Sequence, residues 1–244
     1  MQLHTRLQPS DKDTKEYFSM SRVILDNIPF QPDMTVLQQK LRPRTDSQID
    51  RLERLVREAQ AIARPKALCK VACVDSKGDD HVMIHGVRFK SRVLRVNLER
   101  VHRVFPHIVM CGIELHEWAS SMNDMMTQFW ADAIKTMALY SAGQALDEHL
   151  AEHYRPGKTS CTSPGVFPDW PIQQQRPLFE LLGDTREAIG VQLLTSCWMT
   201  PTQSTSGIIF PTEEDLRIAG CALRNTVPDE ATPLMRPCLS KSIV

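Results

Sequence analysis

The stretch that decides the fold runs from Ser163 to Phe210 and reads SPGVFPDWPIQQQRPLFELLGDTREAIGVQLLTSCWMTPTQSTSGIIF. Proline and glycine break the chain at its start and leave backbone amides and carbonyls free to meet a ligand. An amphipathic helix is expected from Ile172, because Pro171 suits a first helical position. The apolar segments 189–194 and 207–210 predict two buried strands, separated by a polar turn at 200–206 that is rich in hydroxyls.

The same stretch carries short motifs in a fixed order. They are a Pro-Gly loop, Asp-Trp-Pro, a glutamine-containing helix that ends in Leu-Phe, Ile-Gly-Val, a Met-x-Pro turn and Ser-x-Ser-Gly. In this order and spacing the stretch resembles the activation domain of cobalamin-dependent methionine synthase. It looks more like the stand-alone proteins of that superfamily, which accompany corrinoid methyl-transfer systems. A weaker resemblance extends back to about residue 46.

The resemblance implies an α+β fold with a twisted, largely antiparallel sheet flanked by helices. Interspersed strands and helices without a regular βαβ rhythm favour the same class. The resemblance also implies a cofactor site on segments 163–170 and 200–207, both of which we expect to be loops held between apolar elements. The expected cofactor-binding residues are Ser163, Pro164, Gly165, Val166, Asp169, Trp170, Ser196, Met199, Pro201, Ser204, Ser206 and Gly207.

Two positions of the family's binding loop differ here. The family has an Arg four residues before the glycine and a Tyr directly after it, where this chain has Cys161 and Val166. An Arg can hold the carboxylate of S-adenosylmethionine with two charge-assisted hydrogen bonds, and a thiol cannot. We therefore expect the fold to be kept and the affinity for S-adenosylmethionine to be weak or absent.

Asp169 and Trp170 have two interpretations. Asp169 caps the helix that follows and Trp170 anchors the core, or both side chains line the ligand cleft. The sequence leaves both open.

The composition is ordinary for a globular protein. The 244 residues are 42% hydrophobic and 24% charged, and 29 Lys and Arg balance 29 Asp and Glu. A zero net charge argues against binding to nucleic acid or to a membrane surface. No apolar run approaches the ~20 residues of a membrane helix. Seven scattered cysteines are typical of reduced thiols in the cytoplasm.

The chain before this stretch alternates helices and strands. Helical spacing predicts a helix from about Asp46 to Ile62, for which Asp46 or Thr45 can be the cap. It also predicts a second helix from Ser91 to Val101 and a helical region over 114–154 that is broken near 120–124. Strands are expected at 67–74 and 104–113, with one or two more over 81–89, and Pro106 indicates an edge or a bulge. We expect a flexible leader at 1–16, a single domain at 17–218 and a poorly structured tail at 219–244.

No metal site is expected. His149 and His153 share one helix face, but the zinc-protease pattern is missing, and a solvated or capping role fits them better. The segment around His149 also lacks the glycine of the Asp-x-His-x-x-Gly signature of corrinoid-carrying domains, so any corrinoid would be held elsewhere. Many stand-alone relatives end in a tight cysteine cluster, whereas Cys221 here has only the distant Cys238, and we expect no iron–sulfur cluster.

The leading hypothesis is an accessory protein that docks on a corrinoid cofactor or a corrinoid-bearing methyltransferase partner and reactivates or steers it. A cobalamin-linked methyltransferase acting on a small methyl donor or a folate-type acceptor is the first alternative. The second alternative is a non-catalytic binding module of the same fold. The catalytic residues are unknown, and a homo-oligomer stays open.

Overall fold

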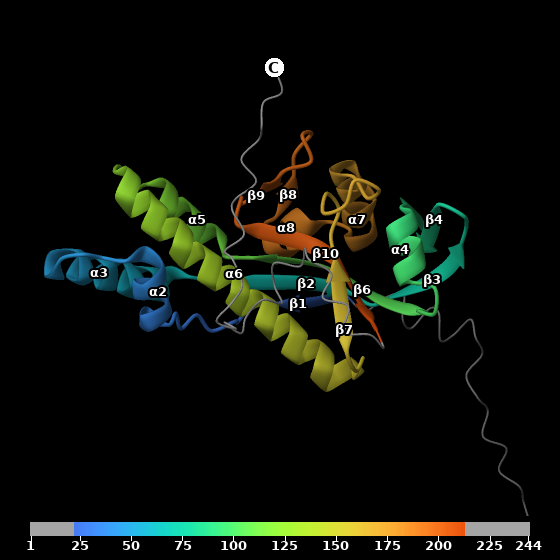
Figure 1. Cartoon of the computed structure of the whole chain (residues 1–244), viewed down its shortest axis with the longest axis horizontal. Helices are drawn as coiled ribbons and strands as arrows, with labels where there is room; N and C mark the ends of the chain where they lie inside the picture. The colour runs from blue at the N-terminus through green and yellow to red at the C-terminus, as the bar shows by residue number, and fades with distance from the viewer. Residues whose placement is uncertain (1–21, 213–244) are drawn as a thin grey trace, which may run out of the picture.

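The structure is a computed structural model that describes residues 22–212 (Figure 1). Within that range, eight strands form one antiparallel sheet in the order β1-β2-β6-β3-β4-β5, with β10 beside β6 and β7 beside β10. The strands are β1 (Arg22–Leu25), β2 (Lys66–Lys70), β3 (Ala72–Lys77), β4 (His81–Ile84), β5 (Val87–Lys90), β6 (Arg103–Met110), β7 (Thr159–Thr162) and β10 (Ser204–Pro211). The expected α+β class with an antiparallel sheet flanked by helices is confirmed.

Strand β6 is the centre of this sheet. It pairs with β10 over Phe105–Met110 on one side, and with β2 and then β3 on the other. Its side chains alternate between two apolar layers, which makes both faces of the strand buried. Val104, Ile108 and Met110 face one layer, and Phe105 and Val109 face the other.

Helix α6 (Met125–Tyr154) covers one face of the sheet. Its small and apolar residues Leu139, Ala142, Leu146 and Leu150 pack on Phe105, Val109 and Ile209. In Figure 1 this helix crosses the sheet diagonally and extends beyond it at its N-terminal end. Ala142 and Gly143 are buried, so the helix can approach the sheet closely at this point.

The other face is covered by shorter elements. These are α4 (Arg92–Asn97), the 3₁₀ turn η1 (Ile172–Gln174), α7 (Gln175–Leu182) and α8 (Thr185–Ile189). Leu178 and Leu182 of α7 lie one turn apart on the apolar side of this helix, and both are buried against Ile108 and Phe210. The expected helix after Pro171 is therefore present and begins with a 3₁₀ turn.

A third apolar cluster lies beyond the sheet edge, among helices. Helices α2 (Met34–Leu41), α3 (Asp46–Ile62) and α5 (Ile113–Ser120) pack there with the N-terminal half of α6. Thr45 begins α3 by accepting a hydrogen bond from the amide of Gln48 at 3.3 Å, as the capping pattern predicts. Asp124 caps α6 in the same way, with the amide of Thr127 at 3.0 Å, and the break expected near 120–124 is confirmed.

One predicted strand is wrong. Segment 189–194 does not join the main sheet, because Ile189 ends α8 and Gly190 terminates that helix with a φ of 82°. Only Gln192–Leu193 (β8) is extended, and it pairs with β9 (Met199–Thr200) in a separate two-stranded hairpin. Ile189 and Val191 are buried as expected, but an apolar run this short fits a helix end as well as a strand.

Pro106 lies in the central strand and not at an edge. On the β2/β3 side the register passes from Cys69↔His107 to Ala72↔Val104, so this ladder is interrupted beside Pro106. Proline has no amide hydrogen to donate to a neighbouring strand. The interruption between β2 and β3 lies opposite Pro106, where this hydrogen bond cannot form. The strand expected at 67–74 is split into β2 and β3, and the segment 81–89 forms the two strands β4 and β5. The leader at 1–16 and the tail at 219–244 lie outside the described residues.

Truncation of the central strand tests this packing. We expect Ile108→Ala to lower the free energy of unfolding by about 2–5 kcal/mol, because Ile108 is fully buried between the sheet and α7. Val96→Ala on α4, where Val96 is 64% exposed, is the control and changes it by less than about 0.5 kcal/mol. Urea unfolding measures both, and equal effects would contradict the assigned core.

Candidate functional site

The loop 163–170 is closed by its own backbone. The amide of Gly165 donates to the carbonyl of Trp170 at 2.7 Å, and the amide of Trp170 donates to the carbonyl of Phe167 at 3.0 Å. Gly165 has a φ of 90°, and a Cβ at this position would stand 3.0 Å from Cδ1 of Ile172. Glycine is therefore required here both by the backbone conformation and by the close approach of Ile172.

Asp169 caps a helix, but not the one that follows it. Its Oδ2 accepts hydrogen bonds from the amide of Val93 at 2.9 Å and from the hydroxyl of Ser91 at 3.0 Å. The Ser91 hydroxyl in turn accepts from the amide of Leu94, so loop and helix α4 share one capping network. These hydrogen bonds, led by that from the Val93 amide, lower the pKa of Asp169 below its ordinary value.

Trp170 is a core residue. Its side chain is 0% exposed and belongs to the apolar cluster beneath α7, with Leu178 and Ile208. Of the two interpretations, the structure favours the core anchor for Trp170. Neither side chain of the pair lines an open cleft, because Asp169 is engaged with α4.

The second segment, 200–207, is only partly a loop. Strand β10 begins at Ser204, so Ser204, Ser206 and Gly207 are strand residues. The Ser204 hydroxyl donates to the carbonyl of Pro201 at 2.7 Å, while Ser206 is buried. Met199 lies on β9 and packs against the core, Pro201 is buried in the turn, and Ser196 is exposed at the hairpin tip.

The two segments meet at Gly207. A Cβ at Gly207 would stand 2.7 Å from the carbonyl oxygen of Thr162 and 2.8 Å from the hydroxyl of Ser163. The structure thus brings the start of the first segment against the end of the second, as the resemblance implies. The contact is a packed one, and the absence of a side chain at Gly207 is what permits it.

The residues present do not fit S-adenosylmethionine as the family holds it. Cys161, at the family's Arg position, is 2% exposed and packs in the apolar layer under α6. Its thiol lies near Gly207, with Sγ 3.3 Å from the position of a Cβ there. A buried thiol cannot hold a carboxylate with two charge-assisted hydrogen bonds as an Arg can, so this position does not supply the contact that the resemblance implies.

The most exposed aromatic side chain near these segments was missed by the sequence analysis. Trp198 is 70% exposed at the turn of the β8–β9 hairpin, and Leu194 beside it is 43% exposed. The turn is held by the amide of Leu194 donating to the carbonyl of Trp198 at 2.8 Å, and by Arg176 donating to the carbonyl of Thr195 at 2.9 Å. No local signal in the sequence points to this exposure, because tryptophan is a residue that is usually well buried.

Other candidates for chemistry are unremarkable within the described residues. The rings of His149 and His153 stack at 4.1 Å on the outside of α6, and His153 Nδ1 donates to the carbonyl of His149 at 3.0 Å. Residues 22–212 contain no group of three or more His, Cys, Asp or Glu side chains arranged to hold a metal ion. Cys221 and Cys238 lie outside this range.

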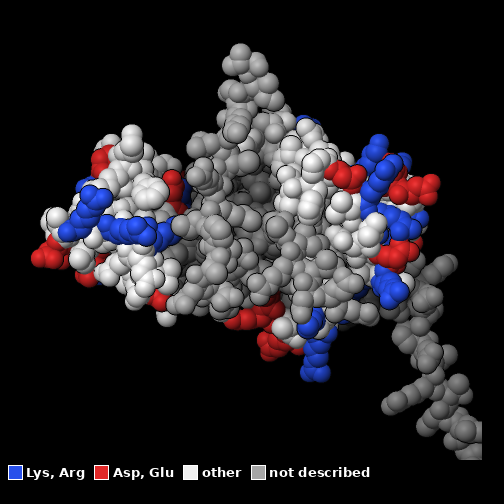
Figure 2. Space-filling model, in the orientation of Figure 1, with Lys and Arg blue, Asp and Glu red and all other residues white. Residues whose placement is uncertain are grey.

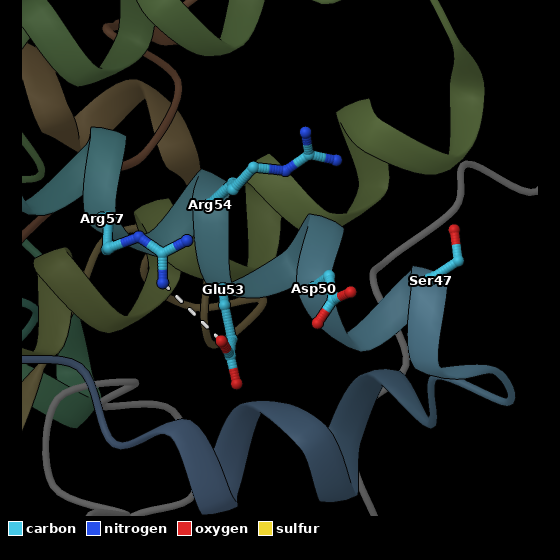
Figure 3. A pocket seen from close by; sticks show the side chains of 5 residues that line it. All are labelled: Ser47, Asp50, Glu53, Arg54 and Arg57. Atoms are coloured by element: carbon cyan, nitrogen blue, oxygen red, sulfur yellow. Dashed lines mark ion pairs between the residues drawn. The ribbon is translucent and has the colours of Figure 1, made fainter.

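A surface hollow of about 380 Å³ lies on α3, far along the chain from the candidate segments (Figure 3). It is lined by Ser47, Asp50, Glu53, Arg54 and Arg57. Glu53 and Arg57 form an ion pair at 3.6 Å on this polar helix face, and both are well exposed. The hollow thus has the character of a solvated helix surface rather than of a ligand site.

Charges of both signs are mixed on the surface. Figure 2 shows blue and red side chains close together at both ends of this face of the molecule. In the part of the chain that the structure describes, no helix is both long and apolar enough to cross a membrane.

The comparisons with known proteins point to one fold. No protein-family model and no curated protein sequence matches the chain. Among solved structures, it is similar to the crystal structure of the MetH reactivation domain bound to AdoHcy, with a TM-score of 0.50 and 16% sequence identity. The match covers 74% of this chain and 67% of that one. At this identity the likeness shows the fold alone, in agreement with the resemblance seen in the sequence.

Removal of the Asp169 carboxylate tests the shared cap. We expect Asp169→Ala to lower the free energy of unfolding at pH 7 by about 1 kcal/mol, because two donors at the start of α4 lose their acceptor. The pKa of Asp169 is lowered in the folded state, so its contribution is present above its unfolded pKa and is lost as the pH falls through its folded pKa. The difference from wild type in urea unfolding should therefore shrink below about pH 4. A difference that stays constant down to pH 2 would contradict the capping role.

Proposed function

We propose that the chain is an accessory protein of a corrinoid-dependent methyl-transfer system, which docks on a corrinoid cofactor or a corrinoid-carrying protein and reactivates or steers it. The observation that carries the proposal is the likeness of the fold to the MetH reactivation domain. The ordered motifs of residues 163–210 support it, since they are the part of the sequence that resembles that family.

In this proposal the chain contacts the corrinoid from outside, whether the corrinoid is free or held by a partner protein. The close contact between Ser163 and Gly207 fixes the two candidate segments relative to each other. The exposed residues around them form the surface that a partner can contact. Gly165, Pro168 and the hairpin residues Leu194 and Trp198 are exposed, whereas Pro164, Trp170, Pro201, Ser206 and Gly207 are buried. Of the expected cofactor-binding residues, the buried ones would thus support the surface from below and not touch the partner directly.

The exposed tryptophan is the best candidate for an anchor. Tryptophan is enriched among residues that carry most of the binding energy of an interface. Trp198 stands on a turn with fixed backbone hydrogen bonds, so little conformational entropy is lost when a partner covers it. A reducing compartment such as the cytoplasm is compatible with the cysteines of residues 22–212, which form no disulfide with one another: Cys69, Cys73, Cys111, Cys161 and Cys197.

The two alternative functions differ from the proposed one in the ligands that the chain would bind. A methyltransferase that acts by itself needs a site for a small methyl donor or a folate-type acceptor, and a non-catalytic module needs neither a corrinoid effect nor a donor. The packed loop 163–170 and the buried Cys161 favour docking over a site for a small methyl donor.

Calorimetry with two ligands tests the proposal. We expect a saturable heat with cobalamin and none with S-adenosylmethionine, because the guanidinium fork is replaced by the buried thiol of Cys161. Gly165→Leu should weaken cobalamin binding through strain in the loop. Gly157→Leu is the matched control, since Gly157 also has a positive φ but faces open space. The absence of a saturable heat with cobalamin would contradict the proposal, and tight binding of S-adenosylmethionine would contradict the role given to Cys161.

Replacement of the exposed tryptophan tests the docking surface. We expect Trp198→Ala to weaken binding to cobalamin or to a cobalamin-loaded methyltransferase by about 30-fold, the size of a central interface residue. Val96→Ala, which removes an exposed apolar side chain from α4, should leave the affinity unchanged. Surface plasmon resonance measures both, and equal affinities for the two variants would place the contact elsewhere.

A further inference from the structure

Four buried polar atoms in the layer beneath α7 have no hydrogen-bond partner. They are Oγ1 of Thr162, Nε1 of Trp170, Oε1 of Gln175 and Oγ of Ser206. Their residues are between 0% and 6% exposed. A buried polar atom without a partner costs about 1–3 kcal/mol, and native proteins rarely leave several of them in one place.

The strand register places two of these residues on the same face of the sheet. Ile208 of β10 lies opposite Thr162 of β7, and Ser206 is two residues before Ile208. Thr162 and Ser206 are therefore diagonal neighbours, with Cα atoms about 7–8 Å apart. Ile208 belongs to the cluster beneath α7, so both hydroxyls face that layer and not α6.

The other two residues, Trp170 and Gln175, lie at the end of the loop 163–170 and at the start of α7. The hydrogen bond from Gly165 to Trp170 returns the chain to the end of β7, and Trp170 packs in the same cluster as Ile208. Gln175 opens α7 on the buried side that it shares with Leu178 and Leu182. All four residues thus contribute to the buried layer beneath α7.

We propose that this layer holds a binding site for a small uncharged molecule that both donates and accepts hydrogen bonds. The two hydroxyls and the indole N–H supply donors, and the Gln175 side chain supplies a carbonyl acceptor. The two nearest charged side chains along the chain are engaged elsewhere, Asp169 with α4 and Arg176 with the carbonyl of Thr195. A neutral occupant fits this environment, either ordered water or the hydroxyl or amide group of a small organic molecule.

This site is separate from the proposed docking surface. Its four residues are buried, whereas the docking surface consists of the exposed residues Gly165, Pro168, Leu194 and Trp198. The inference therefore does not depend on the proposed function, and either one can fail without the other.

Isosteric substitution gives the first test. If Thr162 binds an occupant, Thr162→Val and Ser206→Ala each lose a hydrogen bond and lower the melting temperature by about 2–4 °C. If the hydroxyls are truly unpartnered, removing them relieves a penalty and raises the melting temperature, which would overturn the proposal. Thr185→Val is the control, since the Thr185 hydroxyl is buried but donates to the carbonyl of Val191 at 2.7 Å, and it should lower the melting temperature in either case.

Crystallography of the full chain at high resolution gives the second test. We expect electron density within hydrogen-bond distance of at least three of the four atoms, and none of it in the Thr162→Val Ser206→Ala double variant. Mass spectrometry of the denatured protein distinguishes the occupants, because an organic molecule is released in equal amount with the chain and water is not. A dry layer in the wild type would refute the site.

Discussion

The close approach of β10 to the end of β7 at Gly207 is the contact on which the rest of the structure depends. A side chain at this position would collide with the Thr162 carbonyl and the Ser163 hydroxyl. Because Gly207 has none, β10 can pair with β7 and with the central strand β6 at once. The contact joins the two ends of the motif-bearing stretch, and this explains why segments about forty residues apart in the sequence form one unit.

That unit is built as part of the core. Trp170 packs in the layer under α7, and Asp169 accepts a hydrogen bond from α4. The loop is therefore fixed to two helices. A loop held in this way presents a fixed outer surface and leaves little room to enclose a large cofactor. Docking on a corrinoid that another protein holds is compatible with such a surface, and Trp198 is its most exposed aromatic group.

The sequence predicted the fold class and most of the elements, because capping residues and apolar spacing are local signals. Thr45 and the break near residue 120 are examples. It could not place 189–194, where four apolar residues fit a helix end and a strand equally well. The expected site residues came from the resemblance, and burial decides their roles: whether Asp169 caps its own helix or a distant one depends on tertiary contacts that no local pattern contains.

We propose that the protein acts on a corrinoid without binding S-adenosylmethionine in the manner that the resemblance implies. The most direct measurement is the visible absorption of cob(II)alamin, free or on a methyltransferase, during reaction with a low-potential reductant in the presence of this protein. We predict that an equimolar amount of the protein changes the rate at which cob(II)alamin is converted to cob(I)alamin, with no S-adenosylmethionine added. An unchanged rate, together with an unchanged cob(II)alamin spectrum, would contradict it.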